Sequence, residues 1–248
     1  MSNFSVLNES SLHNTLKIYY AEKTSGKTEV EKNGFIYDIL TNDNQVIEIQ
    51  TKNLSSLAKK IKKTLENKTK ITLVYPLAIS TKIILTDSNG KLVYSRKSPK
   101  KANIYDLLKE LTGIYDFLLQ ENFCLEVIYI NMIEHRVMTE EPVQSKNNRR
   151  RYKKNWIKVN KKLDEIVKIE KFYSKEDYLK LLPPDLNEEF CAKDIKELMK
   201  KNKNIPSRIY NNANLITWLY FRMGILEKTK TKNRSKYFKI DSRVKARE

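Results

Sequence analysis

The sequence predicts an α/β protein: a mixed-sheet core with flanking helices, followed by a small helical unit. Over roughly residues 9–80, the patterns run in the order helix, three strands, helix, strand. Residues 71–79 read ITLVYPLAI, and such a nearly continuous apolar run is typical of a strand buried on both faces beside a parallel neighbour. After residue 172, three short helical patterns precede two short strands, which indicates a second, smaller unit.

Composition narrows the classes of function. With 248 residues, 40% of them hydrophobic, the chain can bury the core of one large or two small domains. Its net charge of +18 favours a polyanionic partner, with nucleic acid first, although a lysine-rich surface that is merely solvated is the alternative. Without a signal peptide or an apolar run near the roughly 20 residues of a membrane helix, we expect a cytoplasmic protein with no membrane partner.

Several common site types are excluded by residue usage. Cys124 and Cys191 stand alone, so no disulfide framework or zinc site is expected. His13 and His135 are the only histidines, and neither lies in an HExxH motif. No glycine-rich phosphate loop of the GxxxxGK or GxGxxG type occurs among the five glycines, so a nucleotide cofactor site is not expected.

Two strands with a tight connection provide the strongest candidate site. Residues 35–40 and 46–51 read as a hairpin, and Glu48, Gln50 and Lys52 share one face of the second strand because side chains alternate. Asp38 lies on the first strand. Two carboxylates can hold Mg²⁺ or Mn²⁺, and an amide or amine can position a water. A shared face requires an odd-length loop or a bulge between residues 40 and 45; otherwise Asp38 lies opposite Ile47, and a solvated polar strand face is the simpler interpretation.

The flanking helices complete this region. Residues 9–22 carry an apolar stripe, and this helix can bring His13 or Glu22 towards the hairpin. Residues 54–66 have a second stripe, with lysines predicted on the opposite face: Lys59, Lys60, Lys62 and Lys63.

The hairpin and its surrounding elements resemble the PD-(D/E)XK nuclease superfamily over residues 9–80. Asp38 and Glu48 match the two acids of its motif, and Gln50 stands at the usual lysine, for which Lys52 can substitute. The stretches ESSLH, EIQT, LVYP and SRKSPK also resemble an uncharacterised bacterial family. The superfamily resemblance implies a Mg²⁺-dependent nuclease acting on double-stranded DNA, with a homodimer where both strands are cut. The alternatives are a non-catalytic nucleic-acid-binding protein and a structural RNA-binding protein.

Two basic segments and the C-terminal unit are the predicted nucleic-acid contacts. Residues 146–162 contain nine Lys or Arg and no acid, with Tyr152 and Trp156 between them, so phosphate contact and base stacking are expected. Residues 172–241 resemble a winged helix-turn-helix domain, with a helix from Ser207 in the recognition position. The predicted contacts are Arg96, Lys97, Lys100, Lys101, Arg149, Arg150, Arg151, Lys153, Lys154, Trp156, Arg208 and Asn211.

These patterns predict three segments. Residues 1–140 are expected to form the nuclease-like domain, residues 141–171 a basic linker or extension, and residues 172–248 the winged helix-turn-helix-like domain.

Overall fold

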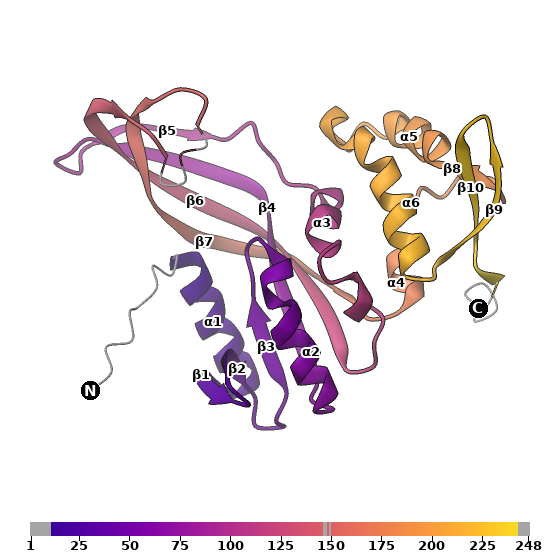
Figure 1. Ribbon diagram of the computed structural model, residues 1–248. Coiled ribbons are helices and arrows are strands. Elements are labelled where there is room, and N and C mark those ends of the chain that lie inside the picture. The colour runs from indigo at the N-terminus through magenta and orange to yellow at the C-terminus, as the bar shows by residue number, and fades with distance from the viewer. Residues whose placement is uncertain (1–10, 146–147, 149, 243–248) are drawn as a thin grey trace.

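The computed structural model of the chain describes residues 11–145, 148 and 150–242. They form an α/β fold with one seven-stranded mixed sheet, one three-stranded sheet and helices around both (Figure 1). The large sheet has the strand order β1-β2-β3-β4-β6-β7, and β5 adds to β4. No helix among the described residues is both long and apolar enough to cross a membrane.

The first half of the chain follows the predicted order of elements. Strands β1, β2 and β3 pair antiparallel in succession, and β4 joins β3 in parallel, as predicted. The elements are α1 (Ser11–Thr24), β1 (Lys27–Lys32), β2 (Phe35–Leu40), β3 (Val46–Ile49), the 3-10 helix η1 (Leu54–Leu57), α2 (Ala58–Glu66) and β4 (Ile71–Thr86).

The two helices cover opposite faces of the sheet. On one face, Leu16 and Tyr20 of α1 pack against Ile39 and Ile47. On the other face, Ile61 of α2 belongs to the larger core. Burial of apolar surface on both sides explains why β4 is apolar almost throughout its first half.

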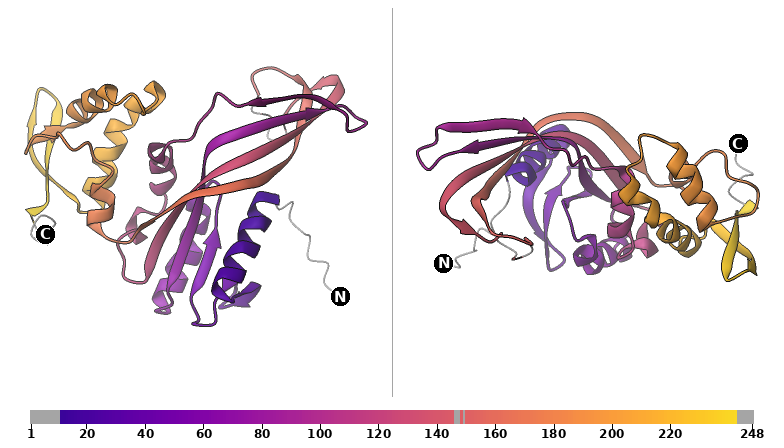
Figure 2. Two further views of the ribbon diagram at one scale, coloured as in Figure 1. Left: turned by 180° about the vertical axis from the view of Figure 1, so that it is seen from behind. Right: turned by 90° about the horizontal axis from the view of Figure 1, so that it is seen from above.

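The long strands continue past the end of β3 and form an arm (Figures 1 and 2). They are β4, β5 (Leu92–Lys97), β6 (Phe123–Val143) and β7 (Lys154–Phe172). We define the arm as residues 80–97, 131–145 and 150–163. The sequence predicts a hairpin of residues 82–85 with 92–95, and β5 indeed pairs antiparallel with β4. Strands β4 and β6 run in parallel along both body and arm, with a register shift between Ala78 and Ser80.

Residues 141–171 are expected to form a basic linker or extension, and residues 154–171 of this segment lie in a strand of the large sheet. They belong to β7, which pairs antiparallel with β6 from Val143↔Lys154 to Leu125↔Phe172. Lysines conceal the strand pattern in the sequence. Leu163, Ile166 and Ile169 nevertheless pack into the core beneath α1, which holds β7 on the sheet.

The apolar pattern over residues 104–119 of the sequence predicts one helix, which is divided in the structure. Helix α3 (Ile104–Leu111) ends before the separate 3-10 turn η2 (Tyr115–Phe117). A Cβ at Gly113 would come within 2.5 Å of Ser55 Cβ, so this close approach to η1 requires glycine.

The C-terminal unit contains helices and a small antiparallel sheet of order β8-β10-β9. Its Ile216 and the Leu107 of α3 belong to one continuous hydrophobic core, which joins the unit to the body. Its elements are α4 (Lys175–Leu179), β8 (Phe190–Cys191), α5 (Ala192–Lys201), the 3-10 helix η3 (Ser207–Asn212), α6 (Ala213–Arg222), β9 (Leu226–Lys232) and β10 (Ser235–Ile240).

Candidate active site

The register of β2 and β3 places two acids opposite each other. Ile39 pairs with Ile47 and Leu40 with Val46, so the connecting loop is residues 41–45 and has an odd length. Thr41 N–H donates to Gln45 O at 2.9 Å, and Asn44 adopts the left-handed conformation with φ 61°. Continuing this register by one residue brings Asp38 opposite Glu48. The odd loop that a shared site requires is therefore present.

Side chains replace the backbone ladder between the two acids. Asp38 N–H donates to Glu48 Oε1 at 3.1 Å. Ile49 N–H in turn donates to Asp38 Oδ2 at 2.8 Å. Each carboxylate thus lies between β2 and β3 and accepts the hydrogen bond of a backbone N–H that would otherwise go to a carbonyl of the neighbouring strand. These hydrogen bonds fix both acids at the point where β3 ends.

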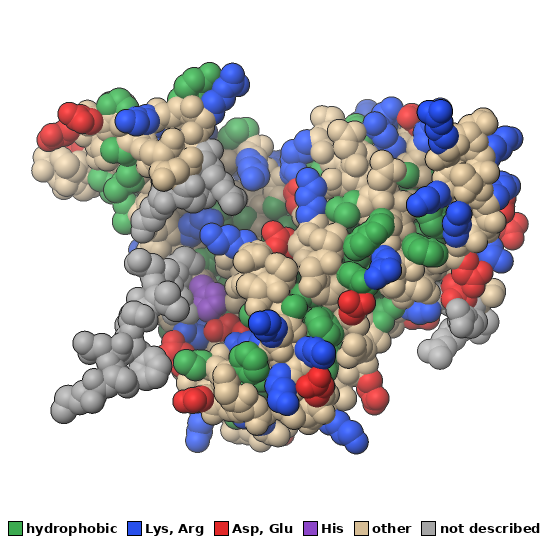
Figure 3. Space-filling view, in the orientation of Figure 1, with side chains coloured by type: hydrophobic (Ala, Val, Ile, Leu, Met, Phe, Trp, Pro, Cys, Tyr) green, Lys and Arg blue, Asp and Glu red, His purple; other side chains and the backbone are tan. Residues whose placement is uncertain are grey.

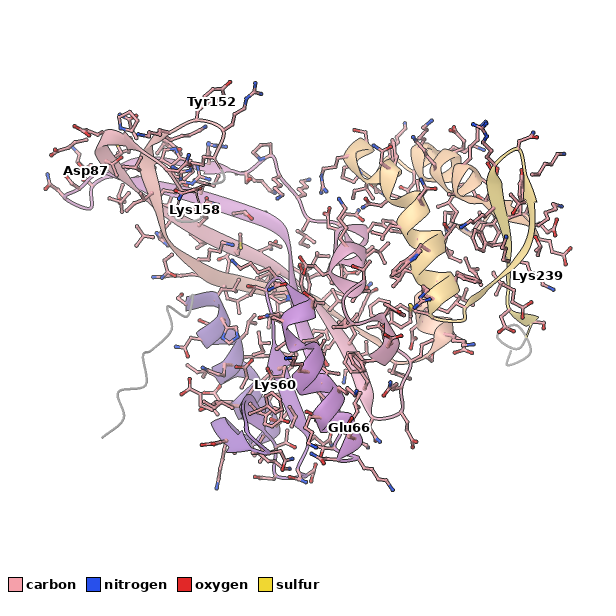
Figure 4. All side chains as sticks on the ribbon, in the orientation of Figure 1. Lys60, Glu66, Asp87, Tyr152, Lys158 and Lys239 are labelled. Carbon is pink, nitrogen blue, oxygen red and sulfur yellow. The ribbon has the colours of Figure 1, made fainter. Side chains whose placement is uncertain are left out.

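Lys60 of α2 completes the site from the second face of the sheet (Figure 4). Its Nζ lies 2.6 Å from Glu48 Oε1 and 4.9 Å from the centroid of the Tyr37 ring. The Glu48 side chain is only 4% exposed and that of Lys60 13%. An ammonium so placed balances the buried carboxylate.

The prediction that Lys60 lies on the solvent face of its helix is wrong. It stands three residues after Leu57 and four before the buried Thr64, at the edge of the apolar stripe. This position at the edge of the apolar stripe is the feature of the sequence that could have indicated a role for Lys60 in the site.

His13 of α1 approaches from the opposite face. Its Nε2–H donates to the carbonyl of Ile49 at 2.8 Å, and Nε2 lies 3.5 Å from Asp38 Oδ2. The sequence favours a packed or surface histidine here and offers contact with the hairpin as the alternative, and the structure shows the alternative. Glu22, the other candidate, lies nine residues further along α1, about 13 Å at 1.5 Å per residue.

The environment separates the pKa values of the two acids. Burial, and next the charge of Asp38, raise the pKa of Glu48 to about 7, although Lys60 opposes them. Burial also acts to raise the pKa of Asp38, but hydrogen bonds from His13 and the Ile49 N–H outweigh it and hold this pKa below its usual value. The pKa of Asp38 is thus lowered and that of Glu48 raised, and such a separation is typical of acids at functional sites.

The donor set fits a hard divalent cation. Asp38 Oδ1 and Glu48 Oε2 make no hydrogen bond within the described part of the chain, whereas the second oxygen of each acid is bonded. Both oxygens also keep some contact with solvent. Among the described residues, the one side-chain polar atom that is fully buried without a partner is the Tyr178 hydroxyl. The described residues hold no group of three or more His, Cys, Asp or Glu suited to a metal. Mg²⁺ suits such a site because it keeps several waters beside one or two carboxylates.

Gln50 and Lys52 make no hydrogen bond or ion pair with the acids in the described part of the chain. Gln50 Nε2 donates to Ser56 Oγ at 3.2 Å, so its amide is turned towards η1. Lys52 is exposed and forms no ion pair with Asp38 or Glu48. The Gln50 amide therefore faces η1 and not the acid pair, because β3 ends at Ile49 and the chain turns into η1. The role of Lys52 beside the acids stays a prediction.

The basic run after β6 is partly structural. Arg136 and Arg150 lie 3.8 and 3.9 Å from the centroid of the Trp156 ring. Two guanidinium groups at these distances cannot share one ring face, so they cover both. Arg150 also donates to Trp156 O at 2.9 Å. The expectation that Trp156 stacks on bases is therefore wrong in this conformation, and Arg149 lies outside the described residues.

Of the remaining residues predicted to contact nucleic acid, Arg208 and Asn211 form hydrogen bonds to other residues of the protein. Arg208 forms a two-pronged ion pair with Asp106 of α3 and donates to Lys101 O, so it joins the C-terminal unit to the body instead of facing solvent freely. Asn211 Oδ1 accepts from Lys196 at 3.2 Å. Arg208 and Asn211 are themselves exposed, and so are the other predicted residues Arg96, Lys97, Lys100, Lys101, Arg151, Lys153 and Lys154.

The comparisons with known proteins give a family model and a relative. The profile of the family described as Domain of unknown function (DUF8091) matches residues 10–173, from α1 to the end of the large sheet. An uncharacterized protein of Treponema pallidum (strain Nichols) is 33% identical over 187 residues, which cover 75% of this chain and 71% of that protein. No solved structure matches the chain. The chain therefore belongs to the DUF8091 family.

Proposed function

We propose that this protein is a Mg²⁺-dependent nuclease of the PD-(D/E)XK type that hydrolyses phosphodiester bonds in DNA. The observation that carries the proposal is the placement of Asp38 opposite Glu48, with Lys60 on Glu48, where β2 and β3 separate. The helix–strand–strand–strand–helix–strand order around this point is the arrangement that the resemblance implies.

The chain supplies the ligands and the positioning groups. Asp38 Oδ1 and Glu48 Oε2 would hold the cation, which when bound supplies a water of lowered pKa and neutralises charge on the scissile phosphate. Lys60 Nζ can donate to the attacking water or to a phosphate oxygen, the role that Gln50 lacks the charge to perform. His13 and the Ile49 N–H keep Asp38 ionised and oriented.

The C-terminal unit supports binding of a duplex. Its order of helices and its β8-β10-β9 sheet resemble a winged helix-turn-helix domain. Because Arg208 is held by Asp106, we assign the contact to the exposed β9–β10 hairpin and not to the start of the helix after Ser207. That hairpin carries the exposed basic residues Lys228, Lys230, Lys232, Arg234 and Lys236.

One observation favours a second candidate, a non-catalytic nucleic-acid-binding protein. The ammonium of Lys60 already neutralises the buried Glu48, so the core is stable without a divalent cation. In this alternative, the Asp38–Glu48–Lys60 group is structural and only the basic surfaces act.

A cleavage assay separates the two candidates. The full chain is incubated with supercoiled plasmid and linear duplex in Mg²⁺, Mn²⁺, Ca²⁺ or EDTA, alongside Asp38→Asn and Glu48→Gln. Glu66→Gln on the exposed face of α2 is the matched control. We expect Mg²⁺-dependent cleavage that both site variants lose by about 100-fold or more, while DNA binding stays equal or tightens. Binding without cleavage in any metal would establish the second candidate.

A further inference from the structure

The base of the arm holds a group of lysines from separate parts of the chain. Lys161 on β7 pairs across the strands with Glu134 of β6, which Lys158 binds at 2.6 Å. The charges of Lys52 and Lys100 also act on Lys161. Lys52 follows β3, and Lys100 lies between β5 and α3. We call these four lysines the lysine seat. In Figure 3, lysine and arginine side chains gather in the hollow between the arm and the body.

Lys161 is the unusual member of the seat because it is half-buried without an ion pair in the described part of the chain. The nearest carboxylate, Glu134, is already bound by Lys158 at 2.6 Å and by Arg136. Burial and the neighbouring lysines lower the pKa of Lys161. A half-buried ammonium surrounded by like charges is destabilising unless an anion binds beside it.

The first turn of α1 connects the seat to the acid pair. Ser11 Oγ donates to Lys161 O at 3.1 Å, and Ser11 N–H donates to Asn160 Oδ1 at 3.4 Å. Two residues later, His13 touches Ile49 O and Asp38. The seat and the acids therefore flank the same end of α1, which advances only about 3 Å over two residues. A strand that crosses the acids would therefore run towards the seat along this end of α1.

We propose that the lysine seat binds a backbone phosphate of the nucleic-acid strand whose scissile bond lies at Asp38 and Glu48. The ligand is a phosphodiester because a continuous strand is the anion that reaches both places. Glu134 orients Lys158, and Lys161, Lys52 and Lys100 provide the uncompensated charge. The inference rests on the proposed function for the position of the scissile bond, and binding at the seat is measured separately from cleavage.

The test compares neighbouring lysines on one strand. Lys161→Gln removes the proposed contact, and Lys162→Gln removes an equal charge from the next residue, which is exposed on the other side of β7. Binding of a fluorescein-labelled duplex is followed by anisotropy over a salt series in EDTA, where no metal-dependent cleavage occurs. For Lys161→Gln, we expect severalfold weaker binding and a salt slope smaller by about one unit. Lys162→Gln should stay near wild type.

Thermal unfolding of the same variants adds an independent readout. Removing a half-buried charge that is repelled by its neighbours should leave the melting temperature of Lys161→Gln equal or higher, unlike the loss of a structural ion pair. Lys100→Gln is the second variant, since Lys100 is exposed outside the strands and its salt slope should fall likewise. Equal slopes for Lys161→Gln, Lys100→Gln and Lys162→Gln would overturn the proposal.

A small-ligand arm identifies the source of the phosphate. Inorganic phosphate and a 5′-mononucleotide are titrated against wild type and Lys161→Gln by thermal shift. Stabilisation of wild type alone, without any change in the duplex salt slope, would make the seat a site for a free phosphate and overturn the backbone assignment. If Lys161→Gln lowers the salt slope of duplex binding but the wild-type protein cleaves DNA in no metal, the seat is a phosphate site and the nuclease proposal is refuted.

Discussion

The β2–β3 hairpin and the basic run over residues 150–162 differ in how closely the contacts in the structure follow the contacts predicted from the sequence. Both are predicted as functional from residue type and spacing alone. In the hairpin, the two acids lie opposite each other, as the prediction requires. In the basic run, Trp156 and Arg150 instead pack on each other and on Arg136, and only part of the run remains exposed.

The difference lies in how far apart along the chain the residues that determine each contact are. The acids meet because a five-residue loop sets the register of two adjacent strands. Trp156 is covered because β6 and β7 pair as Arg136↔Lys158 and Met138↔Trp156, which brings Arg136 alongside it from 20 residues earlier in the chain. The register of two adjacent strands is more easily predicted from the sequence than the residue against which a long cationic or aromatic side chain packs.

The largest expected effect is in the hairpin region. Lys60→Met should reduce Mg²⁺-dependent cleavage by about 100-fold or more, because it removes the charged donor beside Glu48. Lys63→Met is the control, since its side chain is 51% exposed on the same helix. Single-turnover cleavage rates decide the matter. Equal rates for both variants would make Lys60 a structural counter-charge and remove the contrast between the two regions.

The next effect tests the basic run as structure. Trp156→Ala should lower the free energy of unfolding by about 1–2 kcal/mol, because it removes the ring on which Arg136 and Arg150 both pack. Tyr152→Ala, at a residue 65% exposed, should change it by less than about 0.5 kcal/mol. Urea unfolding measures both. If Trp156→Ala keeps its stability but loses DNA affinity, the ring is a stacking platform after all.

A pH series sharpens the comparison at the acids. Because the pKa of Glu48 is raised to about 7, the folded protein holds this proton between about pH 4.5 and 7 more tightly than the unfolded chain, so stability contributed by the group falls as pH rises through that range. Glu48→Gln should remove that part of the slope. A carboxylate must be ionised to bind a cation, so apparent Mg²⁺ affinity, from thermal shift, should rise about tenfold from pH 6 to pH 8. A flat Mg²⁺ response would place the cation elsewhere.

The smallest effects belong to the exposed part of the basic run. Arg151→Ala, Lys153→Ala and Lys154→Ala should each weaken duplex binding slightly and equally for all sequences, with a salt slope smaller by about one unit for each phosphate that is no longer bound. Arg150→Ala should instead reduce stability, since Arg150 holds Trp156. Salt-dependent anisotropy and urea unfolding distinguish the two. Identical behaviour of Arg150 and Arg151 would remove the division within the run.

Most of the body follows from local patterns in the sequence. The order of α1 to β4, the antiparallel pairing of β1 to β3 and the parallel addition of β4 are confirmed. Strand β7 is missed because its lysines outnumber the apolar residues that α1 covers. The break at Gly113 is missed because it depends on the approach of Ser55 from a distant segment.

The sequence alone determined which elements form and which acids can share a strand pair, since alternation, turn residues and apolar stripes act over a few neighbours. Tertiary structure decided that Lys60 and not Gln50 stands beside Glu48, because α2 crosses the sheet above β3 after the chain has turned through η1. It also decided which cations remain available. Arg150 and Arg208 are engaged by Trp156 and Asp106, whereas Lys161 is brought among other lysines without a carboxylate of its own. These outcomes depend on contacts between segments far apart in the chain, which residue spacing does not encode.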